Sequence, residues 1–284
     1  MKTGSEFLDI GVQSSNGYKQ SANTLFNFMR DFDFLIKDIK NMKLYPRYVT
    51  ENVEYLNLTY GNRKVINVAF PMLCFCDINL HKLSLHVEED VKTGSKGYGK
   101  YGVGLDKDWC IKKGLQPVSY LNEKSKKTLE LSEIFNKGLE QMYNDEPLEK
   151  DFFDFILTQL RFSKPLAGKM IMDNDVIEKN FHDEREWRYI PNMSQVAMDD
   201  FLNDATMPKK MAPGALKEYS NTLTTEPSTH IELTLEAIKY IFVATNEDRE
   251  VILKVIRDNN KDNVDDALLL ASKVVVYEEM ERDW

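Results

Sequence analysis

The sequence lacks the features that define several large classes of protein. It has only three cysteines, Cys74, Cys76 and Cys110, and an odd number with one C-x-C pair argues against a disulfide framework. No apolar run approaches the roughly 20 residues of a membrane span, and the N-terminus has no apolar signal core. We therefore expect a cytoplasmic protein that does not enter a membrane.

An excess of positive charge is also missing, because the net charge is −9 over 284 residues. This charge argues against non-specific nucleic-acid binding, and no helix-turn-helix pattern indicates a DNA-binding protein. The charge is uneven, however, since residues 92–127 carry net +6 and residues 247–283 carry net −5. The basic stretch is either a solvated face or a site for an anion or partner, and the sequence leaves both readings open.

Motifs for metal and phosphate binding are absent as well. No spacing of cysteine and histidine matches a zinc site, so we expect no metal ion. Gly97, Gly99 and Gly102 spell G-x-G-x-x-G, but a dinucleotide fingerprint needs a strand before it and a helix after it. Here a lysine-rich loop precedes the glycines and a strand is expected to follow them. We interpret these glycines as part of a tight loop.

What the sequence does have is a series of apolar segments with the periods of helices and strands. Apolar residues at helical spacing predict helices over 31–42, 78–89, 107–113, 125–143, 148–161, 194–202 and 247–257. Apolar runs predict strands over 25–28, 65–76 with an interruption at Pro71, 101–105, 117–121, 231–235, 238–244 and 273–277, and the charged segment 182–191 is also expected to be a strand. Residues 203–229 contain three prolines and little periodicity, so we expect a long loop there.

The composition, 42% hydrophobic and 29% charged, is that of a globular protein with a large core. No internal repeat or clear linker divides the chain. We therefore expect an α+β fold, with a single domain over residues 21–284 and a flexible N-terminus over residues 1–20. In this domain a central, mostly antiparallel sheet is flanked by helices.

The most unusual segment is 182–191, HDEREWRYIP, which places five charges and two aromatic rings in ten residues. In an extended strand side chains alternate between two faces, so Glu184, Glu186 and Arg188 would share one of them. Such a face is either a functional site or a buried network of ion pairs. The sequence does not decide between these two interpretations.

Six segments together resemble the AbiGi family, whose members are described as antitoxins of abortive phage infection. The segments are 25–28 (LFNF), 45–48 (YPRY), 70–78 (FPMLCFCDI), 98–105 (YGKYGVGL), 183–191 (DEREWRYIP) and the C-terminal part, 239–284. The resemblance covers about residues 20–284. It departs at Asn27 and Met29, where the family pattern has histidine and threonine. The resemblance implies a role in phage defence as one partner of a toxin–antitoxin pair.

Two functions are consistent with these observations. In the first, the chain is a non-catalytic antitoxin that binds a cognate toxin or another defence protein and needs no cofactor. An acidic chain can mask a basic toxin surface by charge complementarity. In the second, the chain is an enzyme of the mono-ADP-ribosyltransferase type that uses NAD. A strand at 25–28 followed by a helix at 31–42 resembles the opening of such transferases.

The second function assigns a role to each candidate residue. Glu184-x-Glu186 resembles the E-x-E pair of arginine-directed transferases. Glu186 would hold the ribose hydroxyl and stabilise the developing oxocarbenium charge, while Glu184 would orient the acceptor. The candidate ligand-binding residues are two tyrosines that would stack on nicotinamide and two arginines, the first of them at the diphosphate: Tyr98, Tyr101, Arg47 and Arg188. A metal-dependent nuclease is a weaker alternative, because strand alternation would send the acids of 182–186 to different faces.

Overall fold

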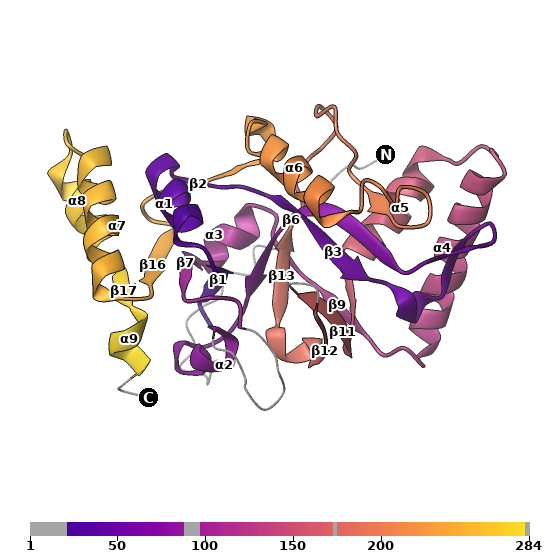
Figure 1. Ribbon diagram of the computed structural model, residues 1–284, viewed down its shortest axis with the longest axis horizontal. Coiled ribbons are helices and arrows are strands. Elements are labelled where there is room, and N and C mark those ends of the chain that lie inside the picture. The colour runs from indigo at the N-terminus through magenta and orange to yellow at the C-terminus, as the bar shows by residue number, and fades with distance from the viewer. Residues whose placement is uncertain (1–21, 88–96, 173–174, 282–284) are drawn as a thin grey trace, which may run out of the picture.

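The computed structural model describes residues 22–87, 97–172 and 175–281 (Figure 1). The strands of the central sheet are β1 Thr24–Met29, β3 Arg47–Asn52, β6 Asn67–Cys76, β7 Tyr101–Asp106, β8 Gln116–Pro117, β13 Glu186–Tyr189, β14 Leu202–Asn203, β16 Ile238–Val243 and β17 Val274–Val276. Four smaller pairs are β2 Lys43–Leu44 with β15 Ile231–Glu232, β4 Leu58–Tyr60 with β5 Arg63–Val65, β9 Ser119–Leu121 with β10 Ser163–Pro165, and β11 Ala167–Met172 with β12 Asp175–Asn180. The helices are α1 Phe32–Asn41, α2 Ser84–Val87, α3 Lys107–Lys112, α4 Lys126–Tyr143, α5 Lys150–Arg161, α6 Pro213–Leu223, α7 Asn246–Asn259, α8 Val264–Ala271 and α9 Tyr277–Met280.

The central sheet has the strand order β17-β16-β7-β1-β6-β13-β8, and β3 and β14 also pair with β6. Its pairings in the described residues are antiparallel except that of β16 with β17. Helices pack around this sheet, so the expected α+β class with a mostly antiparallel sheet is confirmed. The expected flexible N-terminus, residues 1–20, lies outside the described residues.

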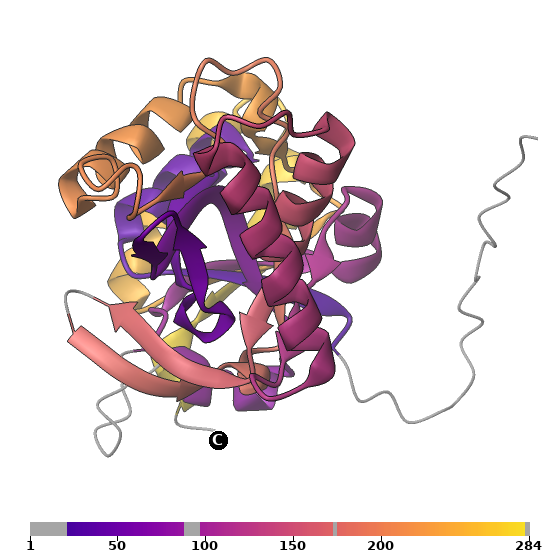
Figure 2. The ribbon, with the colours of Figure 1, turned by 90° about the vertical axis from the view of Figure 1, so that its right-hand side faces the viewer.

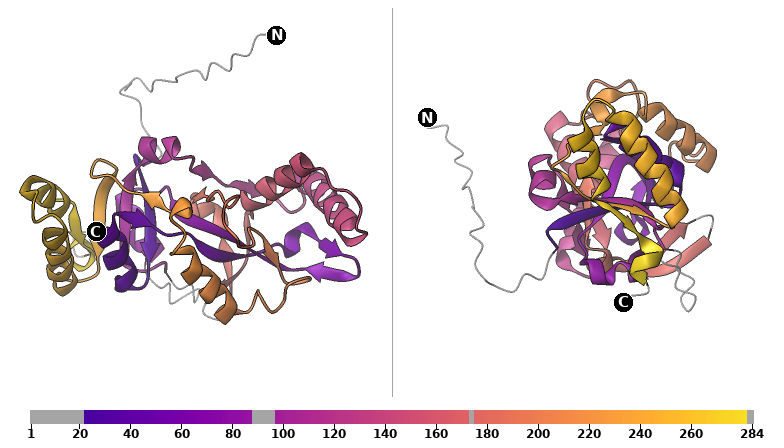
Figure 3. Two further views of the ribbon diagram at one scale, coloured as in Figure 1. Left: turned by 90° about the horizontal axis from the view of Figure 1, so that it is seen from above. Right: turned by 90° about the vertical axis from the view of Figure 1, so that its left-hand side faces the viewer.

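The molecule is elongated along the sheet, with α7 and α8 at one end and α4 and α5 at the other (Figures 1 and 3). Figure 2 looks onto the α4 end and shows the β11–β12 hairpin crossing below it. Each end has its own apolar core. Leu35 and Ile252 belong to a cluster that joins α1 and α7 to the sheet, whereas Phe70, Phe135 and Ile156 join α4 and α5 to β6. The central strands therefore lie between two separately packed halves.

The sheet splits where these two halves meet. Strand β1 pairs with β6 at one register position of the described chain, Phe26 with Cys76, and otherwise follows β7. Strand β3 pairs with the other half of β6, beginning with Arg47 opposite Met72. The amide of Asn27 donates to the carbonyl of Cys74 at 2.8 Å, so this carbonyl faces β1 rather than β13. Strands β1 and β3 thus share one edge of β6 and diverge around residues 73–75.

Pro71 does not interrupt β6, contrary to the expectation from the sequence. The strand is continuous over ten residues, and Pro71 lies opposite Tyr48 of β3. The Tyr48 amide donates to the Ser220 hydroxyl at 3.0 Å, away from β6, so this is a pair without ladder hydrogen bonds. On the other edge of β6, Pro71 falls between β14 and β13. A residue without an N–H group therefore costs no ladder hydrogen bond at this position.

Several expected boundaries are wrong. Residues 194–201 form irregular structure rather than a helix, Leu202 begins β14, and the expected loop over 203–229 contains α6. Helix α6 begins with Pro213, and proline at the first helical position is compatible with a helix because that N–H has no partner in any case. The expected helix over 78–89 is reduced to a 3₁₀ turn and the single-turn α2, and residues 88 and 89 lie outside the described residues. The acidic segment 264–271 was not expected to be a helix and forms α8.

Candidate functional site

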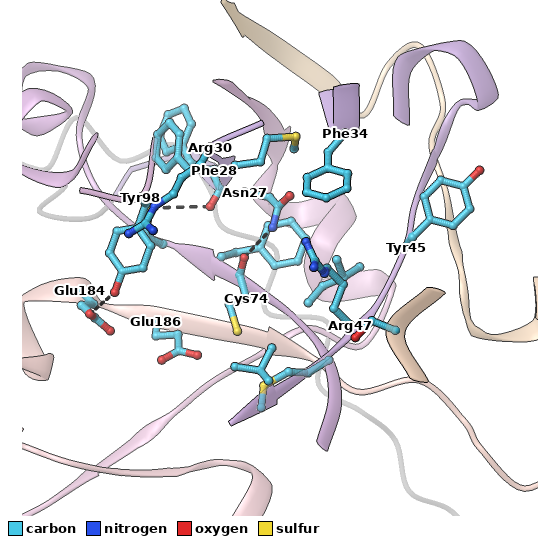
Figure 4. Close-up of a pocket in the computed structure, with 18 of the residues that line it drawn as sticks. Asn27, Phe28, Arg30, Phe34, Tyr45, Arg47, Cys74, Tyr98, Glu184 and Glu186 are labelled. Carbon is cyan, nitrogen blue, oxygen red and sulfur yellow. Dashed lines mark hydrogen bonds between the residues drawn. The ribbon is translucent and has the colours of Figure 1, made fainter. Parts of the chain in front are cut away.

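A cleft of about 590 Å³ opens where β1 and β3 diverge along β6 (Figure 4). Asn27 and Cys74 lie in its middle, with the charged groups Glu184 and Glu186 on one side of them. Phe34, Tyr45 and Arg47 lie on the other side. We call the first side the buried end, because both glutamates are buried, and the second the open end, because Phe34 and Arg47 are exposed.

Strand β13 forms the floor of the buried end. Alternation along the strand places Glu186 and Arg188 on one buried face, and Arg188 Nε donates to Glu186 Oε1 at 2.6 Å. Glu184 reaches the same place by another route, since it ends a 3₁₀ turn over Phe181–Glu184 and is followed by Arg185 in the left-handed conformation (φ 47°). The expected strand over 182–191 is therefore wrong before Glu186, and the chain turns between the two carboxylates.

Lys164 brings the two carboxylates together, and no sequence pattern indicated it. Its Nζ lies 2.9 Å from Glu184 Oε2 and 2.7 Å from Glu186 Oε2. The residue is buried in the middle of the three-residue strand β10, between Ser163 and Pro165. In the sequence Lys164 is one of 37 basic residues and belongs to no motif. Only the tertiary structure shows that it is the shared counter-ion.

Further charges complete the set around these groups. Arg188 Nη2 lies 2.6 Å from Glu51 Oε1 of β3, and Arg188 Nη1 donates to the carbonyl of Arg161 at 2.6 Å. Lys179 Nζ lies 2.9 Å from Glu184 Oε1, and the Tyr98 hydroxyl also donates to that oxygen. The resulting ion-pair network contains three carboxylates and three cations: Glu51, Glu184, Glu186, Lys164, Lys179 and Arg188.

The network keeps its two central carboxylates ionised. Burial alone would raise the pKa of Glu186, but Arg188 and Lys164 outweigh it and lower that pKa. Burial likewise opposes ionisation of Glu184, and two lysines lower its pKa. Burial would lower the pKa of Lys164, but the surrounding carboxylates raise it. Groups held so firmly in their charged forms exchange protons poorly near neutral pH.

The cleft contains four of the six candidate residues that the sequence indicated: Arg47, Tyr98, Glu184 and Glu186. The Tyr98 ring stacks on His86 with 5.1 Å between centroids, and Lys179 Nζ lies 4.1 Å from the Tyr98 ring centre. Tyr101 lies elsewhere, stacked on Phe32 at 5.0 Å with its hydroxyl 3.2 Å from Asp248 Oδ2.

Arg188 is also absent from the cleft wall, because it is fully buried behind Glu186.

The cysteine thiols that line the cleft are not activated nucleophiles. Burial raises the pKa of Cys74 and Cys76 well above the ordinary value, so both stay protonated. In the parts of the chain that the structure describes, no three side chains of His, Cys, Asp or Glu are grouped as metal ligands.

The open end holds its charges differently. The Arg47 guanidinium lies 4.7 Å from the centre of the Phe34 ring, and Lys37 Nζ lies 4.2 Å from the centre of the Tyr45 ring. Phe34 is 41% exposed. Of these residues the sequence indicated Arg47 alone. Phe34 and Lys37 are two positions of an amphipathic helix, and nothing in their spacing separates them from ordinary surface residues.

Comparison with known proteins identifies the family. The family profile described as "Putative abortive phage resistance protein AbiGi, antitoxin" matches residues 42–243. The abortive phage resistance protein AbiGi of Lactococcus lactis subsp. cremoris is 34% identical over 255 residues, which cover 86% of this chain and 100% of that protein. The chain belongs to the AbiGi family.

Membership in the AbiGi family confirms the resemblance seen in the sequence and connects the chain to abortive phage resistance. The range matched by the AbiGi profile includes Arg47, Glu184 and Glu186, whereas Asn27 precedes it. No solved structure matches the chain. Among the described residues of this AbiGi chain, no helix is long and apolar enough to cross a membrane.

Proposed function

We propose that this chain acts in abortive phage resistance as an antitoxin that binds a protein partner and does not catalyse a reaction. The description of the family profile as an antitoxin supports this role. The proposal that the chain is not catalytic rests on one observation: every carboxylate oxygen of Glu184 and Glu186 already has a hydrogen-bond or ion-pair partner. Both oxygens of Glu184 and both oxygens of Glu186 accept hydrogen bonds or ion pairs from Tyr98, Lys164, Lys179 and Arg188.

The occupied oxygens matter because catalysis would require breaking these interactions. For Glu186 to contact a substrate, it would have to give up part of its contact with Lys164 or Arg188, both of which are buried. Leaving a buried charge without its partner typically costs several kcal/mol. The network is therefore best explained as a structural element that joins β13, β10 and β3 across the split in the sheet.

The surface of α8 supports a protein partner with a basic and partly apolar face. Leu268 and Val264 are exposed one helical turn apart, although both are apolar. Asp265 and Asp266 lie beside them in the first turn of the same helix. An apolar centre beside acidic groups is complementary to a basic toxin surface with an apolar patch.

Co-expression with the product of the neighbouring gene tests this proposal. We expect the two proteins to purify together and the growth inhibition caused by the neighbour to be relieved. Leu268→Lys should break the complex, because it adds a positive charge to the proposed contact. Leu129→Lys is the matched control, since Leu129 is similarly exposed (57% against 62%) on α4 at the opposite end of the molecule. Absence of both binding and relief of growth inhibition would contradict the antitoxin role.

A second candidate function is NAD-dependent transfer of ADP-ribose. It is favoured by one observation, that Arg47, Tyr98, Glu184 and Glu186 all line the same cleft. In this function Glu186 would stabilise the oxocarbenium charge and Arg47 would contact the diphosphate. The test is consumption of NAD by the purified chain, with Glu186→Gln as the inactive variant. Glu130→Gln on the exposed face of α4 is the control for contaminating enzymes. No consumption, or consumption that survives Glu186→Gln, would remove this function.

A further inference from the structure

The open end of the cleft contains two cations, Arg47 and Lys37, that form no direct ion pair in the described residues. In the described residues neither Arg47 nor Lys37 forms a hydrogen bond or ion pair, although the chain has 46 acidic against 37 basic residues. Each cation instead lies over an aromatic ring, Arg47 over Phe34 and Lys37 over Tyr45. Packing of the Arg47 guanidinium against the cleft wall lowers its pKa, and the nearby Asp31 carboxylate opposes this shift without forming an ion pair in the described residues.

The cleft has aromatic rings on both sides of Asn27 that suit a flat aromatic ligand. Phe34 presents an exposed ring at the opening beside Arg47, and Phe28 lines the cleft on the other side of Asn27, next to His86. Between them the sheet is split, so polar groups of Asn27 and Cys74 lie within the cleft (Figure 4). The volume of about 590 Å³ is that of a typical site for a small molecule.

We propose that this cleft binds a nucleotide, with its phosphates at Arg47 and Lys37 and its base between the aromatic walls. A guanidinium matches the fork geometry of phosphate oxygens, and a nearby ammonium adds a second positive charge. Aromatic side chains provide stacking for a base without dictating its identity. The site goes beyond the antitoxin role and does not depend on turnover, because it uses the open end and leaves the ion-pair network intact.

A small nucleotide fits better than a nucleic acid or a phosphorylated protein. The same end of the cleft is lined by Asp31 and Asp38, and the chain as a whole is acidic. A polyanion would meet this repulsion over many groups, whereas one diphosphate meets it only locally. Asp31 already accepts from the amide of Asp33 as the cap of α1, and burial raises the pKa of Asp38 well above its ordinary value.

Isothermal titration of the full chain with ADP tests the proposal, with adenosine and pyrophosphate as partial probes. We expect ADP to bind and each partial probe to bind about tenfold or more weakly, because each lacks one of the two recognised parts. Arg47→Gln should weaken ADP binding about 10- to 100-fold, as expected for lost hydrogen bonds to a charged group, and should leave adenosine binding unchanged. Lys37→Gln should weaken ADP binding to a smaller degree.

The matched control is Lys113→Gln. Lys113 Nζ also lies over an aromatic ring, 5.4 Å from that of Trp109, but outside the cleft. We expect this variant to bind ADP as the unmodified chain does. No binding at about 1 mM ADP, equal binding of pyrophosphate and ADP, or unchanged binding in Arg47→Gln would each overturn the proposal. Co-purification with the neighbouring gene product tests the antitoxin role separately. Failure to bind ADP would therefore leave the antitoxin role standing, and failure to co-purify would leave nucleotide binding standing.

Discussion

The two ends of the cleft differ in whether their charged side chains form ion pairs. At the buried end each of six charged groups has a partner of opposite sign within 2.9 Å. At the open end Arg47 and Lys37 lie over aromatic rings and form no ion pair in the described residues. A desolvated charge must be neutralised, whereas a solvated one can remain available to a ligand. The oxygens of Glu184 and Glu186 are therefore already occupied by protein partners, whereas the Arg47 guanidinium forms no ion pair in the described residues.

Removing Lys164 should have the largest effect on stability. In Lys164→Met, Glu184 and Glu186 lose their shared cation while remaining buried, and we expect a loss of about 3–5 kcal/mol in the free energy of unfolding. Urea denaturation followed by circular dichroism measures this loss. Arg188→Gln should produce a loss of the same order, because it leaves Glu51 and Glu186 without their arginine.

The control for this prediction is Lys126→Met, which removes an exposed lysine paired with Glu130 one helical turn away. Its expected effect is within about 0.5 kcal/mol, as for most exposed ion pairs. Adding Glu184→Gln to Lys164→Met should recover part of the loss by removing one unpaired carboxylate. If Lys164→Met unfolded with nearly unchanged stability, the buried end would not be the structural element inferred here.

Removal of the Asn27 side chain should have an intermediate effect. Its amide bridges β1 to the Cys74 carbonyl at the point where ladder pairing between β1 and β6 stops. Asn27→Ala leaves that carbonyl without this donor, so we expect a loss of about 1–2 kcal/mol by the same denaturation measurement. Asn259→Ala removes a similar bond to the carbonyl of Lys40 on the exposed surface and should cost less. Equal losses in the two variants would show that the split in the sheet gives Asn27 no special importance.

A smaller effect is expected from His86, which lines the cleft beside Tyr98. Burial lowers the pKa of His86 from an ordinary value of 6.5 to about 4. Between these values the unfolded chain binds a proton that the folded chain does not, so stability falls as pH falls. We expect His86 to contribute about 1 kcal/mol to the loss between about pH 7 and pH 5.5. His86→Gln should flatten this part of the profile, and the exposed His81→Gln should not. A profile unchanged in His86→Gln would contradict this assignment.

The fold was predictable from the sequence where periodicity is local. Helices α1, α4, α5 and α7 and strands β1, β7 and β16 follow from apolar spacing within the segments themselves. The failures have two physical causes. Proline is common in loops, but Pro213 begins α6, and the alternation predicted through Glu184 stops because the chain turns at Arg185.

The candidate site was less predictable because it depends on contacts between distant segments. Glu184 and Glu186 were indicated by their clustering, but their partners Lys164 and Glu51 come from other strands with no shared pattern. The split between β1 and β3 is likewise a property of strand pairing, since both compete for one edge of β6. Sequence spacing shows which charges are close along the chain, and only the fold shows which of them are already neutralised.

The smallest expected effect on stability is that of Arg47→Gln. This variant makes the same arginine-to-glutamine change at the open end as Arg188→Gln makes at the buried end. Arg47 is exposed and forms no ion pair in the described residues, so we expect the free energy of unfolding to change by less than about 0.5 kcal/mol. Loss of ADP binding with unchanged stability would separate ligand binding from folding at this residue. A loss as large as that of Arg188→Gln would instead show that both ends of the cleft serve to hold the sheet together, and the contrast between them would disappear.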